Sequence, residues 1–421
     1  MPSLAINGGA PVCPNPHLSH STIGRRERMA VMEVMKSGVL SDFMGVWGDK
    51  FYGGKQVQAL ERKWADYFGT AHAVSMNSAT SALYAAVGAA GISPGDEVIV
   101  SPYTMTASAT AALIYGGIPV FADIDEDTFC ITADTIAERF TEHTRAIIAV
   151  DLFGHPVDFF KIWPRINRYD ITVIEDAAQA LGATFYGGQA GNFGDIGVHS
   201  LNYHKHIHCG EGGIAVTNDD RLAERLRLIR NHAEVVVGDA GTVDLSNMVG
   251  FNYRMGEIEA AIASVQLDRL DGIVRGRRQN AALLTDILHG IPGITTPVTL
   301  PGCEHAWYLY AMKYDEQVIG VPRDIFVKAV QAEGVPLFAG YVKPIYLEPL
   351  YQKKIAFGKY GYPFTAAHRP IEYHLGDCPV AERMHFKELM YTPVCGMGAL
   401  ETLDFADAMG KVLDHVDELD Y

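Results

Sequence analysis

The sequence lacks the features that mark membrane, secreted and metal-binding proteins. Its 421 residues include six cysteines without a CxxC pair, so neither a zinc site nor a disulfide framework is indicated. No run approaches the roughly 18 apolar residues of a membrane helix. The N-terminus lacks the basic start and long apolar core of a signal peptide. We therefore expect a soluble protein with reduced thiols, located in the cytoplasm.

The chain also lacks an excess of basic residues. It has 50 Asp and Glu against 34 Lys and Arg, which gives a formal net charge of −16. Nucleic acids and anionic membranes bind basic surfaces, so we expect neither as a partner. An anionic substrate stays compatible, because a local basic pocket can form on an acidic surface. The length suffices for two domains and a large core.

Strand-like and helical segments alternate along the first half of the chain. Apolar strand-like runs occupy residues 71–76, 96–100, 118–122, 146–150 and 172–176. Regular alternation with helices predicts an α/β fold whose sheet is mostly parallel and covered on both faces. We expect an N-terminal arm (1–24), a large domain (25–275) and a smaller C-terminal α/β domain (276–421). Residues 233–249 read as a loop, and 257–274 as one long helix.

The candidate chemistry concentrates between Thr172 and Thr217. One strand ends at Asp176, at the sheet edge where open α/β folds bind ligands, and another leads towards Lys205. Pyridoxal phosphate (PLP) needs such a pair: an amine for the Schiff base with its aldehyde, and a buried anion that keeps its ring nitrogen protonated. Desolvation and the nearby pyridinium would lower the pKa of Lys205, which frees its amine as nucleophile and proton carrier.

From spacing alone, other interpretations of these residues stay open. An Asp at a strand end is often a helix cap, and a lone Lys is usually a solvated surface charge. The motif from His204 to His208, HKHIH, has the spacing that sets three imidazoles on one face of a strand, as a metal site requires. We favour no metal, because the cofactor better explains the lysine in its middle.

A candidate anion site follows the strand at 71–76. The residues Asn77, Ser78, Ala79 and Thr80 lead into a helix of small residues. The free N–H groups of a helix N-terminus bind phosphate, helped by the helix dipole. Asn-Ser is also a common helix cap, so the bare pattern leaves both interpretations open.

Several motifs, taken in order, resemble one enzyme family. They are EDAAQALGA (175–183), GDIGVHSLNYHK (194–205) and GEGGIAVT (210–217), with NSATSAL (77–83), GFNYRM (250–255) and CPVAER (378–383). Together they resemble the sugar aminotransferases of the DegT/DnrJ/EryC1/StrS family over nearly the whole chain. The resemblance implies the fold type I, aspartate-aminotransferase-like architecture and PLP as cofactor.

The resemblance also implies roles for individual residues. Ser78, Ala79, Thr80 and Ser200 match phosphate contacts, and Gln179 matches a contact to the ring hydroxyl. Asn252 matches a residue that reaches across a dimer interface to the phosphate of the other subunit, which implies a homodimer with shared active sites. Simpler structural roles stay open: a first-turn helix residue for Gln179, a strand-end Ser for Ser200 and a helix cap for Asn252.

The chain departs from the family where an aromatic ring usually stacks on the cofactor. That ring follows a Thr in the loop after the strand at 98–100, and here the position holds Met105. A thioether can pack on an aromatic face, and Tyr103 is the alternative. The stacking residue is therefore open.

The activity that the resemblance implies is transamination. The family's donors are glutamate or glutamine, and its acceptors are nucleotide-linked keto sugars or keto-cyclitols, with Lys205 moving the proton. A dehydratase branch replaces the Schiff-base Lys with His, and Lys205 in register favours transamination. A dehydratase or aromatising synthase of the same family, or a non-catalytic PLP-fold sensor, remains the alternative.

Overall fold

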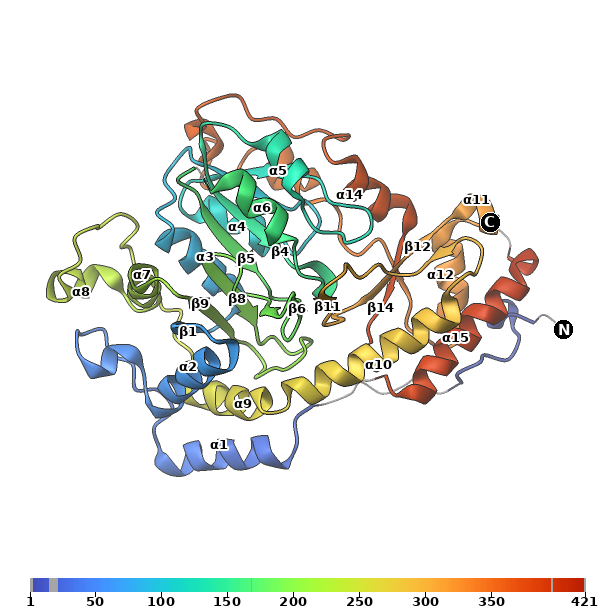
Figure 1. Ribbon diagram of the computed structural model, residues 1–421, viewed down its shortest axis with the longest axis horizontal. Coiled ribbons are helices and arrows are strands. Elements are labelled where there is room, and N and C mark those ends of the chain that lie inside the picture. Colours follow the sequence, from blue (N-terminus) through green and yellow to red (C-terminus); the bar gives the residue numbers. More distant parts are fainter. Residues whose placement is uncertain (1–2, 15–21, 168, 395–396, 420–421) are drawn as a thin grey trace.

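A seven-stranded sheet is the centre of the larger part of the molecule (Figure 1). The computed structural model describes residues 3–14, 22–167, 169–394 and 397–419. The strand order is β1 (His72–Met76), β9 (Gly213–Thr217), β8 (Ile196–Ser200), β5 (Thr172–Asp176), β4 (Thr144–Val150), β2 (Glu97–Val100), β3 (Ile118–Phe121). Only β9 runs antiparallel to its neighbours in this sheet, so the expectation of an α/β fold with a mostly parallel sheet is confirmed.

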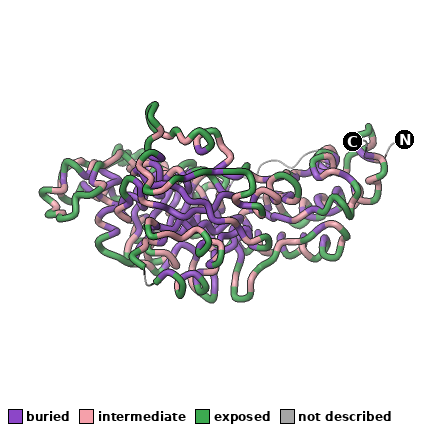
Figure 2. The backbone as a smooth tube through the Cα atoms, turned by 90° about the horizontal axis from the view of Figure 1, so that it is seen from above, coloured by how far each residue is buried: buried purple, intermediate pink, exposed green. Residues whose placement is uncertain are grey.

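Both faces of this sheet are covered, as the apolar strands require. Ile214 and Val216 of β9 join a cluster with helices α2 (Lys55–Phe68) and α9 (Glu257–Leu267), whereas Ala215 joins the cluster of α3 (Ala79–Ala89). The sheet is the most continuously buried part of the chain (Figure 2). The other helices of this part are α1 (Arg25–Ser37), α4 (Ala107–Ile114), α5 (Ala133–Arg139), α6 (Phe159–Ile166) and α7 (Asp220–Arg230).

The C-terminal part has a separate apolar cluster around a four-stranded antiparallel sheet. Its strands are β10 (Ile294–Thr295), β12 (Tyr310–Tyr314), β14 (Leu389–Thr392) and β13 (Phe338–Ala339), covered by α12 (Arg323–Ala332) and α15 (Ala399–Asp414). Arm residues 3–14 pack here: the N–H of Cys13 donates to the carbonyl of Glu333 at 2.8 Å. The long helix α10 (Leu270–Leu288) joins the two parts and crosses the predicted boundary at 276, so the division into domains stays a prediction (Figure 1).

Part of the predicted C-terminal domain returns to the large sheet. Tyr346 and Tyr373 belong to the same apolar cluster as the seven strands. The Tyr373 hydroxyl donates to the carbonyl of Pro119 on β3 at 2.8 Å, and Arg369 forms an ion pair with the buried Glu97 of β2. This segment, with α13 (Pro349–Gln352) and α14 (Pro379–Arg383), packs against the edge strand β3, whose exposed backbone would otherwise invite further pairing.

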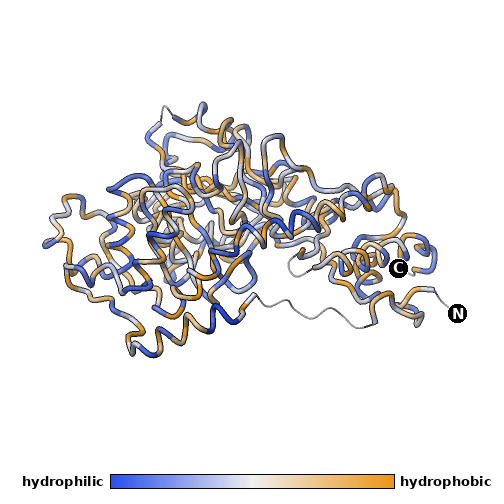
Figure 3. The backbone as a smooth tube through the Cα atoms, turned by 60° about the horizontal axis from the view of Figure 1, so that its bottom comes forward, coloured by the Kyte–Doolittle hydropathy of each residue, from blue (hydrophilic) through white to orange (hydrophobic). Residues whose placement is uncertain are grey.

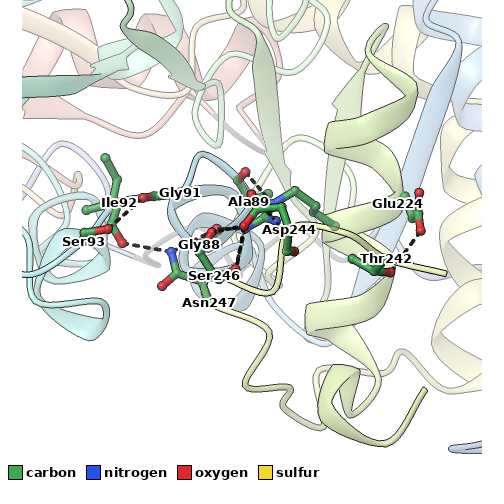
Figure 4. A network of polar contacts seen from close by, with 11 residues as sticks. Gly88, Ala89, Gly91, Ile92, Ser93, Glu224, Thr242, Asp244, Ser246 and Asn247 are labelled. Atoms are coloured by element: carbon green, nitrogen blue, oxygen red, sulfur yellow. Dashed lines mark hydrogen bonds and ion pairs between the residues drawn. The ribbon is translucent and has the colours of Figure 1, made fainter. Parts of the chain in front are cut away.

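The expectation of a loop at 233–249 is wrong in its first half. Residues Ala233–Ala240 form helix α8, which ends at Gly241 in the left-handed conformation. The helix was not expected because three consecutive β-branched valines have a low helix propensity and show no helical period. The loop that follows is fixed to the end of α3: Arg225 donates to the carbonyls of Ala89 (3.0 Å) and Ser246 (2.6 Å), and Asn247 donates to that of Ile92 (Figure 4).

The expectation of one helix over 257–274 is also wrong, because α9 ends at Leu267 and α10 begins at Leu270. Two residues at this break contact α1: Gln266, near the end of α9, and Arg269, directly before α10, both donate to the carboxylate of Glu27. The remaining elements are β11 (Cys303–Glu304), β6 (Thr184–Phe185), β7 (Gly188–Gln189) and α11 (Glu316–Ile319). Hydrophilic and hydrophobic residues alternate closely along the chain (Figure 3), and no described helix is long and apolar enough to cross a membrane.

Candidate functional site

The register of the strands brings the predicted anion-binding residues together. Gly213, the first residue of β9, pairs with Met76 at the end of β1 and with Ser200 at the end of β8. A Cβ on Gly213 would lie 2.4 Å from the backbone N of Ala79, so only glycine lets β9 approach the turn after β1. Ser200 and the turn at 77–80 therefore flank one strand end, although more than 100 residues separate them in the sequence.

The turn itself has the structure that anion binding needs. Ser78 caps α3, and its Oγ accepts from the N–H of Ser81 at 3.0 Å. Ala79 and Thr80 form the first turn, where an α-helix supplies no internal acceptors for its N–H groups. All three predicted residues are half-buried. The free N–H groups thus lie at the sheet edge, where a phosphate can reach them.

Asp176 lies at the end of β5 and is 4% exposed. Its Oδ2 accepts from the hydroxyl of Ser108 at 2.7 Å, and its Oδ1 accepts from the N–H of Ala178 at 3.2 Å. Burial raises the pKa of Asp176, although these two bonds and the charge of Lys205 oppose the rise. Ser108, on α4, was missed from the sequence, because one serine in a helix carries no signal.

Lys205 interacts electrostatically with Asp176. Burial lowers the pKa of Lys205 to about 8; Asp176 opposes this change, and the guanidinium of Arg277 adds to it. The Nζ atom lies 4.3 Å from the centroid of the Tyr308 ring. A buried carboxyl group at the end of β5 therefore interacts with an amine of lowered pKa in the turn that follows the neighbouring strand β8, as the cofactor interpretation requires.

Gln179 is fixed by two hydrogen bonds inside the site. Its Oε1 accepts from the N–H of Phe153 at 3.0 Å, and its Nε2 donates to the hydroxyl of Tyr341 at 3.0 Å. Tyr341 has a φ of +48°, a conformation that side chains with a Cβ seldom adopt. Neither aromatic residue was predicted: Phe153 contributes only its backbone N–H, and Tyr341 reaches the site from a distant part of the chain. A strained backbone such as that of Tyr341 often marks a functional position.

The two candidates for ring stacking differ in their freedom to move. Tyr103 is fully buried, and its hydroxyl donates to the carbonyl of Gly340 at 2.8 Å. Met105 is 60% exposed. Turning Tyr103 towards a ligand would break its hydrogen bond, whereas Met105 can reorient at no such cost. Which of them stacks on the cofactor ring stays a prediction.

Asn252 lies on the surface next to the anion-binding turn of its own chain. Its Oδ1 accepts from Nε of Arg254 at 2.8 Å, and the neighbouring carbonyl of Tyr253 accepts from the N–H of Asn77. Exposure leaves the side chain accessible to another molecule. That it contacts the phosphate of a partner subunit stays a prediction.

The three histidines of the HKHIH motif have separate environments. His204 is exposed, His208 is half-buried, and the buried His206 has its Nε2 3.0 Å from the carbonyl of Ala306. Burial lowers the pKa of each ring. Within the described ranges, no group of three or more His, Cys, Asp or Glu side chains is placed to hold a metal ion.

Most of the chain matches a known protein family. The model of the DegT/DnrJ/EryC1/StrS aminotransferase family matches residues 27–377. The chain belongs to this family. The spore coat polysaccharide biosynthesis protein SpsC of Bacillus subtilis is 33% identical over 349 residues, which cover 81% of this chain and 86% of SpsC.

Two solved structures extend the similarity to the whole fold. The aminotransferase from Psychrobacter cryohalolentis is 27% identical with a TM-score of 0.82, over 96% of this chain and all of that one. DesI, solved in the presence of its TDP-sugar product, is 28% identical with a TM-score of 0.82, over 99% of this chain and 97% of DesI. The fold is therefore that of the fold type I aminotransferases.

The family depends on PLP, and the residues present fit that group. Lys205 offers an amine, and Asp176 offers a carboxyl group for the ring nitrogen. The first turn of α3 offers free N–H groups for the phosphate, with Ser200 beside it. The site thus has a matching group for each polar end of the cofactor.

Proposed function

We propose that this protein is a PLP-dependent aminotransferase. It moves an amino group from glutamate or glutamine to the ketone carbon of a nucleotide-linked keto sugar or a keto-cyclitol. The observation that carries the proposal is the electrostatic interaction of Lys205, in the turn after β8, with Asp176 at the end of the neighbouring strand β5, in a chain of this family.

Each residue of the site has a defined task in this proposal. The bound cofactor supplies an electron sink for the substrate carbon. The Nζ of Lys205 takes and returns the proton at that carbon, and a pKa of about 8 suits both directions near neutral pH. Asp176 holds the proton on the ring nitrogen, with Ser108 fixing its carboxyl group. Gln179 holds the ring hydroxyl, and Ser78, Ala79, Thr80 and Ser200 hold the phosphate.

The relatives support a sugar-like acceptor. DesI was solved with its TDP-sugar product, and SpsC is named for polysaccharide biosynthesis. Because the identities are 28% and 33%, they support the class of acceptor and leave its identity open between a nucleotide-linked sugar and a cyclitol.

We also propose a homodimer whose active sites are shared through Asn252. Helix α1 supports it, because Met29, Met32 and Met35 lie three residues apart and are each more than half exposed. Monomers seldom leave such apolar rows uncovered. A cytoplasmic location completes the proposal, supported by the free thiols of Cys130, Cys209, Cys303 and Cys378.

The test of the proposal is an amino-transfer assay with a panel of acceptors. The purified protein with PLP is incubated with amino-labelled 15N-glutamine or 15N-glutamate and one keto sugar or keto-cyclitol at a time. Mass spectrometry should find the label in the acceptor, and Lys205→Ala should abolish the transfer. A product that has lost a hydroxyl group would identify a dehydratase, and an aromatic product would identify a synthase. Cofactor binding without turnover of any acceptor or donor would favour a sensor.

A further inference from the structure

His206 of the HKHIH motif takes no part in the proposed reaction. His206 is fully buried, and burial lowers its pKa well below the ordinary value, so the ring is neutral. Its Nε2 lies 3.0 Å from the carbonyl of Ala306, and its Nδ1 has no hydrogen-bond partner in the part of the chain that the structure describes. A neutral ring has one N–H, and it therefore donates from Nε2 to Ala306. His206 thus fixes a segment from the C-terminal part of the chain beside Lys205.

That segment, residues 305–309, is held from several other sides. Arg277 of α10 donates to the carbonyl of Trp307 at 3.1 Å, and Arg278 donates to that of His305 at 3.0 Å. The N–H of Tyr308 donates to the carbonyl of Phe153 at 2.8 Å. Trp307 has a φ of +53°, a conformation that persists only where surrounding contacts impose it. The backbone that carries Tyr308 is therefore fixed.

The fixed segment places an aromatic ring against the reactive amine. The Nζ of Lys205 lies 4.3 Å from the centroid of the Tyr308 ring. A cation within about 6 Å of a ring centroid is attracted by the negative face of the ring, and more strongly where water is partly excluded. Lysine has a long flexible stem, so an amine that is not covalently bound needs such a contact to stay in place.

We propose that Tyr308 is a positioning residue for Lys205: its ring face binds the ammonium form and holds the amine in the site, and His206 fixes that ring through Ala306. The inference rests on the proposed function in one respect, because it takes Lys205 as the reacting amine. It adds a residue that the sequence motifs do not mark.

The other charged groups that face the amine act in known directions. Asp176 of β5 favours the ammonium form, and Arg277 of α10 opposes it. The adjacent rings of His204 and His206 have lowered pKa values and add no charge at neutral pH. Tyr308 and Asp176 therefore both favour the ammonium form of Lys205, whereas burial and Arg277 oppose it.

The test measures the pKa of the Lys205 amine in the cofactor-free full-length protein. Amines are labelled competitively over a range of pH, and mass spectrometry follows the peptide with Lys205. Tyr308 is replaced by phenylalanine, and then by phenylalanines with one, two and three ring fluorines. The fluorines keep the shape of the ring and weaken the negative potential on its face. We expect a stepwise fall in the pKa of Lys205 by about half a unit to one unit in total, a three- to tenfold change in the ratio of amine to ammonium.

Two comparisons complete the design. The same fluorinated series at Tyr203, an exposed ring that contacts His204, should leave the pKa of Lys205 unchanged. His206→Leu should lower it in the same direction as the fluorines and should speed hydrogen exchange in residues 305–309. A flat or rising pKa across the Tyr308 series would overturn the proposal. Because no cofactor is present, that result would leave the proposed transamination standing, whereas failure of amino transfer would leave this measurement valid.

Discussion

Two buried carboxyl groups in this molecule have opposite electrostatic surroundings. Glu27, at the start of α1, accepts from the N–H of Gly24 (2.7 Å), from Gln266 (2.7 Å) and from Arg269 (2.9 Å). Burial alone would raise the pKa of Glu27, but the backbone N–H of Glu27 and these three donors outweigh burial and lower the pKa to about 2. Asp176 has one hydroxyl and one N–H as donors, and burial raises its pKa.

The difference separates a structural group from a functional one. The donors around Glu27 stabilise its charge without a ligand, and the cluster holds α1 against the junction of α9 and α10. Asp176 is buried and Lys205 half-buried, each with fewer partners, and the pKa of each is shifted in the direction that favours its neutral form. A ligand that brings a protonated ring nitrogen and an aldehyde would relieve both. Perturbed pKa values of this kind mark sites of chemistry.

The largest effect in this comparison should come from removing the amine. Lys205→Met should lower the rate of amino transfer by about a thousandfold or more, because the residue has the roles of both attachment and proton transfer. The folded cofactor-free protein should not lose stability. Lys205 has a pKa of about 8 when folded and a higher one when unfolded, so its burial penalty is present at low pH and disappears as the pH rises above 8. Denaturation of both proteins at pH 7 and at pH 10 should show that the free energy of unfolding of the wild type rises relative to that of the variant between these two pH values.

Replacing the ring partner should have the next largest effect. Asp176→Asn should lower kcat/KM by about a hundredfold or more, because a neutral amide does not keep the ring nitrogen protonated. Unfolding by urea should show equal or higher stability, since the variant removes a poorly solvated charge. A loss of stability with unchanged kcat/KM would reverse the assignment and make Asp176 the structural group. Ser108→Ala is the matched control and should weaken activity less.

Glu27→Gln should have the opposite pattern. We expect the free energy of unfolding to fall by about 1–3 kcal/mol at pH 7, because a charged acceptor is removed from two side-chain donors and a backbone N–H. The activity of the folded enzyme should be unchanged. The pKa is lowered on folding, so the wild-type advantage is full above about pH 4.5 and is lost as the pH falls towards 2. A pH-independent difference in stability would contradict this origin.

The smallest effect should come from Met105→Ala. An exposed thioether that packs on one face of the cofactor ring contributes little to the affinity for PLP, so the Kd for PLP should rise about two- to tenfold in an equilibrium titration. Tyr103→Phe is the companion variant: it loses the bond to Gly340 and should reduce stability more than cofactor affinity. An unchanged Kd in Met105→Ala would remove Met105 as the stacking residue.

Local patterns predicted the sheet and the ends of its strands. The fully apolar runs identified the strands, and Ser78 followed by small residues identified the start of α3. Asp176 was found because it ends such a run, and Lys205 was found because it follows the end of another run by five residues. The short spacing within these motifs made them visible without any knowledge of distant contacts.

Contacts between distant segments could not be predicted in this way. Tyr308 and Tyr341 reach Lys205 and Gln179 from the C-terminal part of the chain, and tyrosines carry no signal of their own in that region. The return of Tyr373 to β3 depends on tertiary packing, which no periodicity encodes. Helix α8 was missed because its valines suit a strand as well as a helix.

The most direct test of the central claim is an absorption titration of the purified protein with PLP, for the wild type and Lys205→Ala, before and after addition of glutamate or glutamine. We predict that the wild type forms a borohydride-reducible bond at Lys205, located by peptide mass spectrometry, and that an amino donor converts the bound cofactor to its pyridoxamine form. Lys205→Ala should form no such bond. A wild type that binds no cofactor, or whose cofactor responds to neither donor, would contradict the account.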